Sequence, residues 1–358
     1  AGWLSLEGIS SGDENGSKGI SLIGNPGLAS LSTTTGNINI TGLSTNQHGL
    51  YLWGNTSITT TDGNIIITGT SESTDDIAAY GPTPIHSITT TNGDITLNAN
   101  RVVLDNITTI SAGDTLSIQT ASNNTSIGLG NGAAGTLNLN AAELAVLSAG
   151  NRIVIGNADN AGAVHINNAD LTGETLALYG GAMTIDGGLD ADALSLISKG
   201  NITLNGAVTA TDTGNSIIMK GSGFTNTAGA NGIDAGAGRY LVYMDTPSSV
   251  VKGGLGAKNL YNRTYSGHPP SSIAQSWGDR FVFAYQPTLT FTPHNQSLNT
   301  YNPSYNTFPY TVSGMVPGDS LADIFSGLPS FSKQETQFGT YRINGTNGSL
   351  TSLLGYKF

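Results

Sequence analysis

The sequence predicts an all-β protein, with a right-handed parallel β-helix followed by a small β-sandwich-like module. The strongest observation is a repeat: Ser57–Ile65, reading SITTTDGNI, returns at Ser87–Ile95 as SITTTNGDI, and an earlier copy occupies Ser30–Ile38. The composition agrees, with 49 glycines and only 10% charged residues among 358. Finally, no long segment has the 3.6-residue apolar period of an amphipathic helix.

Each copy of the repeat contains the parts of one structural unit. A short strand of β-branched residues leads into an Asn/Asp/Gly turn, and a second short strand follows. Units that recur at such a short, nearly regular interval are typical of solenoids, in which each unit buries its apolar face against the next. We therefore expect stacked coils from the start of the chain.

The same pattern of turns and short strands continues to residue 238. A turn pair containing glycine precedes a run in which apolar and polar residues alternate, which predicts strands with one buried face. Such runs lie at 115–118, 136–139, 152–155, 175–178, 202–204 and 216–219. The turn glycines are unequally spaced, since Gly173 and Gly200 lie farther apart than Gly200 and Gly214. A parallel β-helix tolerates this variation because extra residues can loop out at a corner.

The composition changes near residue 239. Of 13 tyrosines 10 lie at or beyond Tyr240, as do 8 of 9 phenylalanines. Strands are predicted at 239–243 and 280–285, on either side of a long irregular stretch, and an all-β segment begins at residue 288. We therefore predict three parts: the β-helix at 1–238, an aromatic junction or cap at 239–287, and a small β-module at 288–358.

Composition and charge narrow the function. The chain has no cysteine, which excludes disulfides and thiol chemistry. No apolar run is long enough for a transmembrane helix. Residues 1–238 hold 5 Lys/Arg against 19 Asp/Glu, a net charge of −14, which disfavours nucleic-acid partners. Because the sequence starts at Ala1 without an export leader, we expect it to be processed or part of something longer.

The junction and the module contain motifs of a known kind. Arg239–Tyr243, Asn259–Tyr265 and Phe281–Leu289 together resemble the C-terminal end of filamentous-haemagglutinin-like exoproteins. The segments at 301–305, 310–314, 318–319 and 339–341, which read YNPSY, YTVSG, GD and GTY, resemble the small β-modules that follow such solenoids.

This resemblance implies a large secreted adhesin of two-partner secretion in Gram-negative bacteria. Such proteins leave through a dedicated outer-membrane transporter, stay at the cell surface or are released, and act in attachment, aggregation or biofilm. Their secretion domain carries an Asn-Pro-Asn-Gly signature, which Gly24–Gly27 (GNPG) matches only weakly. We therefore expect this chain to be the distal portion of a larger exoprotein.

Six aromatic residues in the last third are candidates for ligand binding, because amphipathic rings stack on sugars and anchor protein contacts. They are Tyr261, Tyr265, Trp277, Tyr301, Tyr305 and Tyr310. The alternative is that they fill the cores of the cap and the module. The expected partner is a cell-surface glycan, a protein receptor or a matrix polysaccharide.

Two other functions stay open. A β-helix enzyme that cleaves polysaccharides would need clustered carboxylates. Asp75–Asp76 is one such pair, and Asp186, Asp190 and Asp192 form a denser group that is also a weak candidate for calcium, although solvated turn residues explain both. The five histidines show no ligand spacing, so we predict no cofactor and no enzyme. The third possibility is a spacer without a ligand of its own.

Overall fold

The computed structural model describes residues 2–11, 16–81, 86–295, 308–337 and 340–358. Its chain divides into two compact units. Unit 1 comprises residues 1–241 and 250–256, and unit 2 comprises residues 242–249 and 257–358. Most of the predicted junction at 239–287 thus falls in the same unit as the predicted module at 288–358.

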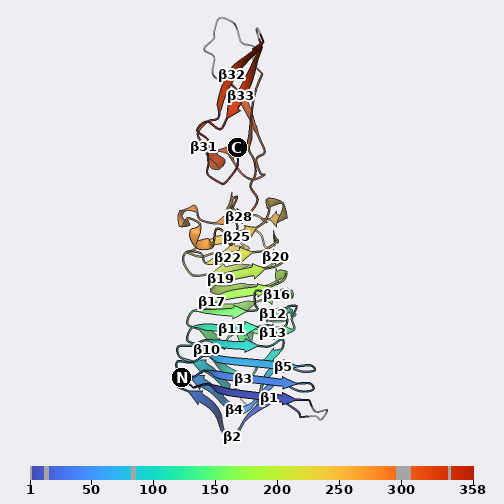
Figure 1. Cartoon of the computed structure of the whole chain (residues 1–358). Helices are drawn as coiled ribbons and strands as arrows, with labels where there is room; N and C mark the ends of the chain where they lie inside the picture. The colour runs from blue at the N-terminus through green and yellow to red at the C-terminus, as the bar shows by residue number, and fades with distance from the viewer. Residues whose placement is uncertain (1, 12–15, 82–85, 296–307, 338–339) are drawn as a thin grey trace. The chain divides into compact units, whose positions relative to one another are not determined.

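Unit 1 is a solenoid of parallel strands, as the repeat predicts (Figure 1). Its strands form three sheets, A, B and C. Sheet A contains β1 (Leu4–Ser10), β3 (Ile38–Ser44), β5 (Ile65–Ser71), β8 (Ile95–Asn98), β11 (Thr115–Gln119), β15 (Arg152–Ile155), β17 (Ala169–Gly180), β19 (Leu189–Ser198), β21 (Val208–Ala210), β22 (Ile217–Lys220) and β24 (Ile233–Asp234).

Sheets B and C complete the coils. Sheet B contains β2 (Ile20–Thr33), β4 (Leu50–Thr60), β6 (Ile77–Tyr80), β7 (His86–Thr90), β9 (Val102–Val103), β10 (Ile107–Ala112) and β14 (Leu147–Ala149). Sheet C contains β12 (Ile127–Gly130), β13 (Leu137–Leu139), β16 (Val164–Asn167), β18 (Met183–Ile185), β20 (Asn201–Leu204), β23 (Gly223–Asn226) and β26 (Val250–Val251). A single-turn helix, α1 (Ala141–Leu144), lies between β13 and β14.

The core of unit 1 consists of aliphatic ladders. In sheet A each inward residue of one strand is the register partner of an inward residue on the next. One such ladder runs Leu4, Ile38, Ile65, Ile95, Leu116, Ile153, Leu176, Leu194, Ile217. From Ile38 to Ile217 these side chains are at most 1% exposed. Stacking therefore buries the apolar face that a single coil cannot bury alone.

The repeated phrase places one threonine in a structural role. Thr33, Thr60 and Thr90 are register partners on β2, β4 and β7. The Thr60 hydroxyl donates to the Gly36 carbonyl at 3.1 Å and accepts from the Gly63 amide at 3.2 Å. Thr90 repeats the pattern one coil later, with the Gly63 carbonyl and the Gly93 amide. The repeat therefore encodes a turn that is bonded to the preceding turn.

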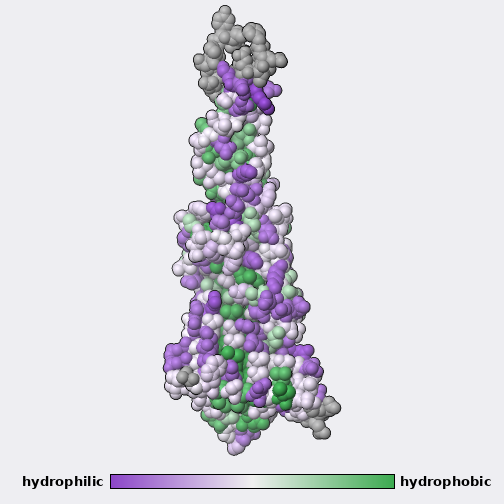
Figure 2. Space-filling model, in the orientation of Figure 1, coloured by the Kyte–Doolittle hydropathy of each residue, from purple (hydrophilic) through white to green (hydrophobic). Residues whose placement is uncertain are grey.

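The first coil is incompletely covered. Among the strands that the structure describes, β1 pairs with β3 alone and β2 with β4 alone. Four large apolar side chains in this region are more than half exposed: Trp3, Ile9, Ile23 and Leu28. Figure 2 shows hydrophobic residues gathered where Figure 1 draws β2 and β4. Unpaired strand edges of this kind are potential pairing surfaces.

Unit 2 is built from short elements. Unit 2 includes the second part of β25 (Tyr240–Met244). Its other strands are β27 (Lys258–Leu260), β28 (Arg280–Phe283), β29 (Thr290–Pro293), β30 (Tyr310–Ser313), β31 (Phe325–Ser326), β32 (Ser330–Gln337), β33 (Thr340–Thr346) and β34 (Thr351–Ser352). It also contains the short helix α2 (Leu321–Ile324) and three 3-10 turns at Pro247–Ser249, Pro270–Ser272 and Gln275–Trp277. β27 and β28 are parallel, whereas β29–β30, β31–β34 and β32–β33 are antiparallel pairs. The β-sandwich arrangement of the module stays a prediction.

Asp319 connects distant segments within unit 2. Its Oδ2 accepts hydrogen bonds from the hydroxyls of Tyr261 at 2.7 Å and Tyr356 at 2.6 Å, and its Oδ1 accepts from the Asn259 side-chain amide at 2.8 Å. Burial and this carboxylate raise the pKa of both phenols well above their ordinary value, so they remain donors. One carboxylate thus holds β27, a turn and the C-terminal segment together.

Candidate ligand-binding surface

The predicted aromatic residues of the last third have different environments. Tyr261 is fully buried and packs against Phe283 and Tyr356, so it belongs to the core of unit 2 and not to its surface. Tyr265 is half-buried and edge-on to Tyr243, with ring centroids 5.2 Å apart. Trp277 is 38% exposed.

Of the other three predicted aromatic residues, only Tyr310 is among the residues that the structure describes. Tyr310 is half-buried, with its ring centroid 5.6 Å from that of Phe291. Tyr301 and Tyr305 lie outside the described residues. Trp277 is therefore the one large exposed ring of this set among the residues that the structure describes.

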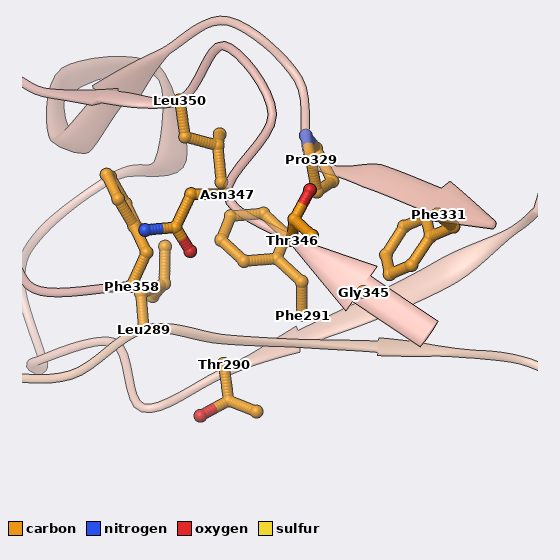
Figure 3. Close-up of a pocket in the computed structure, with 10 residues that line it drawn as sticks. All are labelled: Leu289, Thr290, Phe291, Pro329, Phe331, Gly345, Thr346, Asn347, Leu350 and Phe358. Atoms are coloured by element: carbon orange, nitrogen blue, oxygen red, sulfur yellow. The ribbon is translucent and has the colours of Figure 1, made fainter. Parts of the chain in front are cut away.

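A pocket of about 210 Å³ lies in unit 2 (Figure 3). Its walls are about equally polar and apolar, and they include three phenylalanine rings. The lining residues are Leu289, Thr290, Phe291, Pro329, Phe331, Gly345, Thr346, Asn347, Leu350 and Phe358. Figure 3 shows the Phe291 ring between Asn347 and Phe331. The pocket offers an apolar surface and three neutral polar side chains.

Two of the three clustered carboxylates that were candidates for calcium, Asp186 and Asp192, make hydrogen bonds within unit 1. Asp192 accepts from the Gly173 amide and from the Thr211 hydroxyl, while Asp186 accepts from the Asn205 side chain. Asp190 lies on the same outer face of β19 as Asp192. In the part of the chain that the structure describes, no three His, Asp or Glu side chains are placed to share a metal ion.

The side chains of Asp75 and Asp76 lie in different environments, because Asp76 is buried and Asp75 is not. Asp76 is buried and accepts hydrogen bonds from the backbone amides of Ser71, Asn100 and Arg101, so it organises the corner between coils. Asp75 lies outside and accepts a hydrogen bond from the Tyr80 hydroxyl at 3.1 Å. Only Asp75 is therefore placed to meet a ligand.

Asp75 borders a group of outward rings that we call the Tyr51 cluster: His48, Tyr51, Trp53 and Tyr80. Tyr51 and Trp53 alternate with the buried Leu50 and Leu52 on β4, and Tyr80 on β6 is the register partner of Trp53. All four residues are half-buried. The pattern Leu-Tyr-Leu-Trp thus turns its aromatic residues outward because its leucines occupy the core.

The rings of the Tyr51 cluster contact one another. Tyr51 is nearly parallel to both of its neighbours: its centroid lies 5.4 Å from that of His48 and 6.1 Å from that of Trp53, with interplanar angles of 16° and 13°. The Tyr80 ring is tilted, with its centroid 6.0 Å from that of Tyr51. Aromatic surfaces on rigid strands, held by neighbouring rings, suit the apolar face of a flat ligand.

Polar groups surround these rings. The Lys18 ammonium lies 4.5 Å from the centre of the Tyr51 ring, a cation–π contact. The His48 Nδ1 donates to the Asp75 carbonyl at 3.2 Å. Burial and the Asp75 carboxylate raise the pKa of Tyr80 to about 12, so its hydroxyl stays protonated. The surface therefore combines apolar rings with hydrogen-bond donors and acceptors at its margin.

His86 supports Tyr80 from within the coil. It is fully buried, its Nε2 donates to the Tyr80 carbonyl at 3.0 Å, and its Nδ1 accepts from the Thr56 hydroxyl at 2.6 Å. This arrangement fits a neutral imidazole, and burial lowers the pKa of His86 below its ordinary 6.5.

We predict that acid destabilises unit 1 through His86. The unfolded chain binds the proton more tightly, so this contribution is complete above pH 6.5 and is lost as the pH falls towards the folded-state pKa. The melting temperature of the wild type should therefore fall more than that of His86→Gln between about pH 8 and about pH 5. His165→Gln, on the outer face of β16, is the control; equal pH dependence in the wild type and His86→Gln would contradict the prediction.

Sequence reasoning overlooked the Tyr51 cluster. Its members are spread along the chain from His48 to Tyr80, in a region otherwise poor in aromatic residues. The signal that could have found half of it is the alternation at Leu50–Trp53, since aromatic residues opposite leucines on a strand must face outward. The meeting with Tyr80 depends on register between coils.

Comparisons with known proteins add no relative. No protein-family model matches the chain, and no significant match occurs among curated protein sequences or solved structures. None of the helices that the structure describes has the length and apolar character needed to cross a membrane.

Proposed function

We propose that this chain is a secreted bacterial surface adhesin whose solenoid binds carbohydrate through the Tyr51 cluster. The observation that carries this proposal is the group of mutually packed, outward rings on β4 and β6. Soluble proteins rarely leave several large aromatic residues together on one surface unless that surface has a partner. The resemblance to filamentous-haemagglutinin-like exoproteins supports the secretion, the cell-surface location and the adhesive role.

The chemistry of the cluster favours a sugar over a nucleic acid or an acidic protein. Aromatic faces pack against the C–H groups of a pyranose ring. Polar groups beside the rings, such as Lys18 and Asp75, can form hydrogen bonds with the sugar hydroxyls. The acidic balance of residues 1–238 repels polyanions. Support on parallel strands adds rigidity, which lowers the entropic cost of binding.

The proposal predicts that Trp53→Ala and Tyr51→Ala each weaken glycan binding at least about tenfold, because each removes a large face of the surface. The measurement is a glycan-array screen of the whole chain, followed by calorimetry with the glycans bound. Tyr179→Ala is the matched control, since Tyr179 points outward from β17 on sheet A. Circular dichroism should show the same fold in all variants.

Three results would contradict the proposal. If the wild-type chain binds no glycan on the array, the result would favour a spacer without a ligand or an adhesin that binds a protein receptor. Binding that survives both aromatic substitutions would move the site elsewhere, with Trp277 the next residue to test. Cleavage of a bound glycan would favour the enzyme that the sequence left open.

A further inference from the structure

We infer that the ligand is an extended, neutral polysaccharide chain that lies along β4, from the Tyr51 cluster onto a field of serine and threonine hydroxyls. This inference rests on the proposed carbohydrate-binding function and specifies its ligand class. Such a site would bind the internal sugar units of a polymer and not only a terminal sugar, and we call this arrangement a track.

The first step of the argument is the continuity of the outer face of β4. The strand alternates without interruption from Leu50 to Thr60. Its outward side chains are, in order, Tyr51, Trp53, Asn55, Ser57 and Thr59. Eight residue steps of about 3.3 Å give a path of at most about 26 Å, comparable to several sugar units. The path passes Gly54, whose φ of 72° departs from extended backbone where β4 changes partner from β6 to β7. One strand therefore joins the aromatic rings to the hydroxyls.

The second step concerns the strands on either side, which continue this chemistry in register. At one end Trp53 lies between Ile23 on β2 and Tyr80 on β6. At the other end the partners of Ser57 and Thr59 also carry hydroxyls: Ser30 and Ser32 on β2, and Ser87 and Thr89 on β7. We call these six residues the hydroxyl field. The strip is thus three strands wide, apolar at one end and hydroxylated at the other.

Some hydroxyl groups of the hydroxyl field are available to form hydrogen bonds with a ligand. Ser87 donates to Ser57 at 3.2 Å. The hydroxyls of Thr59 and Thr89 make no hydrogen bond to any residue that the structure describes, and both residues are half-buried. Each hydroxyl can donate once and accept twice, which matches the mixed donors and acceptors of a sugar.

The third step is charge. No outward position on β2, β4, β6 or β7 within the strip carries a charged residue. Two charged side chains lie at its aromatic end: Lys18 over the Tyr51 ring, and Asp75 beside the Tyr80 hydroxyl. Beyond the aromatic end the described residues of the strip offer no cation, so sulfated or uronic polysaccharides would meet the acidic balance of unit 1 with Lys18 as the one cation described at the strip. The charges therefore favour neutral glycans.

Other repetitive columns on unit 1 lack this combination. On sheet A the outward column that contains Thr96 and Ser117 also contains Ile66 and Val154. On sheet C the outward threonines at Thr184 and Thr203 follow His165. Neither column begins at an aromatic cluster on the same strand. Thr96→Val and Thr184→Val are therefore matched controls for substitutions in the hydroxyl field.

The test measures how affinity depends on chain length. The probes are β-1,4-linked oligomers of glucose and of N-acetylglucosamine, from two to six units, titrated into the whole chain by calorimetry. We expect affinity to rise with length. The double variant Thr59→Val/Thr89→Val should weaken binding of the hexamer about tenfold and leave the dimer unchanged, because only the longer chain reaches the hydroxyl field. Trp53→Ala should weaken both.

The outcomes separate this inference from the proposed function. Equal affinity for dimer and hexamer, with both sensitive to Trp53→Ala, would overturn the track and leave a carbohydrate site for sugar ends. A hexamer that binds Thr59→Val/Thr89→Val as tightly as the wild type, or that is equally weakened by the two control substitutions, would also overturn it. Binding restricted to anionic glycans would overturn the predicted neutrality. Failure of every glycan to bind would overturn both proposals.

Discussion

Gly63→Ala should be among the most destabilising single-methyl additions in this protein. A Cβ at Gly63 would lie 2.0 Å from the carbonyl oxygen of Gly36 and 2.9 Å from the Thr60 hydroxyl. The first of these is backbone in the coil below, and it already accepts the hydrogen bond of Thr60. The neighbour cannot rotate away, so the coils must separate locally. We expect a loss of about 3 kcal/mol, the upper range for overpacking.

The same contact recurs along the corner of the solenoid. A Cβ at Gly93 would lie 2.1 Å from the Gly63 carbonyl oxygen, and one at Gly150 would lie 2.1 Å from that of Gly113. These glycines are needed for close approach between stacked turns and not for an unusual backbone angle. Thermal melting and amide hydrogen exchange would measure the effect. Gly27→Ala, with no atom within 4 Å of the added Cβ, is the control; a Gly63→Ala protein as stable as that control would refute this account.

Asp319→Ala should produce an equally large effect in unit 2. It would leave the phenol of Tyr261, which is fully buried, the phenol of Tyr356 and the amide of Asn259 without their shared acceptor. Hydrogen bonds to a charged group each contribute about 1.5–3 kcal/mol, although contributions within one network do not add. We expect a loss of about 3 kcal/mol or more in the free energy of unfolding of unit 2.

The experiment compares three variants by chemical denaturation. Asp319→Asn retains one acceptor oxygen and should be intermediate. Asp323→Ala removes a carboxylate from the exposed ion pair with Lys258 and should change stability little, since solvent screens such pairs. Near-equal unfolding curves for Asp319→Ala and Asp323→Ala would show that the Asp319 network is not important for stability.

Much of the fold of unit 1 could be predicted from local pattern. Alternation identified strands such as Leu116–Ile118, and the repeated threonine-rich phrase that ends in glycine located the turns that stack at Gly36, Gly63 and Gly93. These predictions succeeded because period-two burial and turn chemistry are properties of a few consecutive residues. The parallel arrangement followed from the repeat, since identical units stack in one direction.

The candidate site was harder to predict because it depends on contacts between coils. Tyr51 and Tyr80 lie on different strands and far apart in sequence, and the length of chain looped out at the intervening corners decides whether they meet. Composition drew attention to the tyrosine-rich last third, where the structure buries Tyr261 to build a small core. Aromatic enrichment alone does not distinguish a core from a binding surface.

The sequence by itself therefore determined the all-β class, the stacked parallel coils, the stacked turns and the acidic, helix-poor character of this protein. Only the tertiary structure decided which coils align, that Trp53 lies beside Tyr80 and Ile23, and that Asp319 joins Tyr261 to Tyr356. The physical reason is the range of the interactions. Strand and turn propensities act within a few residues, whereas the register between coils is set by burying complete apolar ladders across the whole stack.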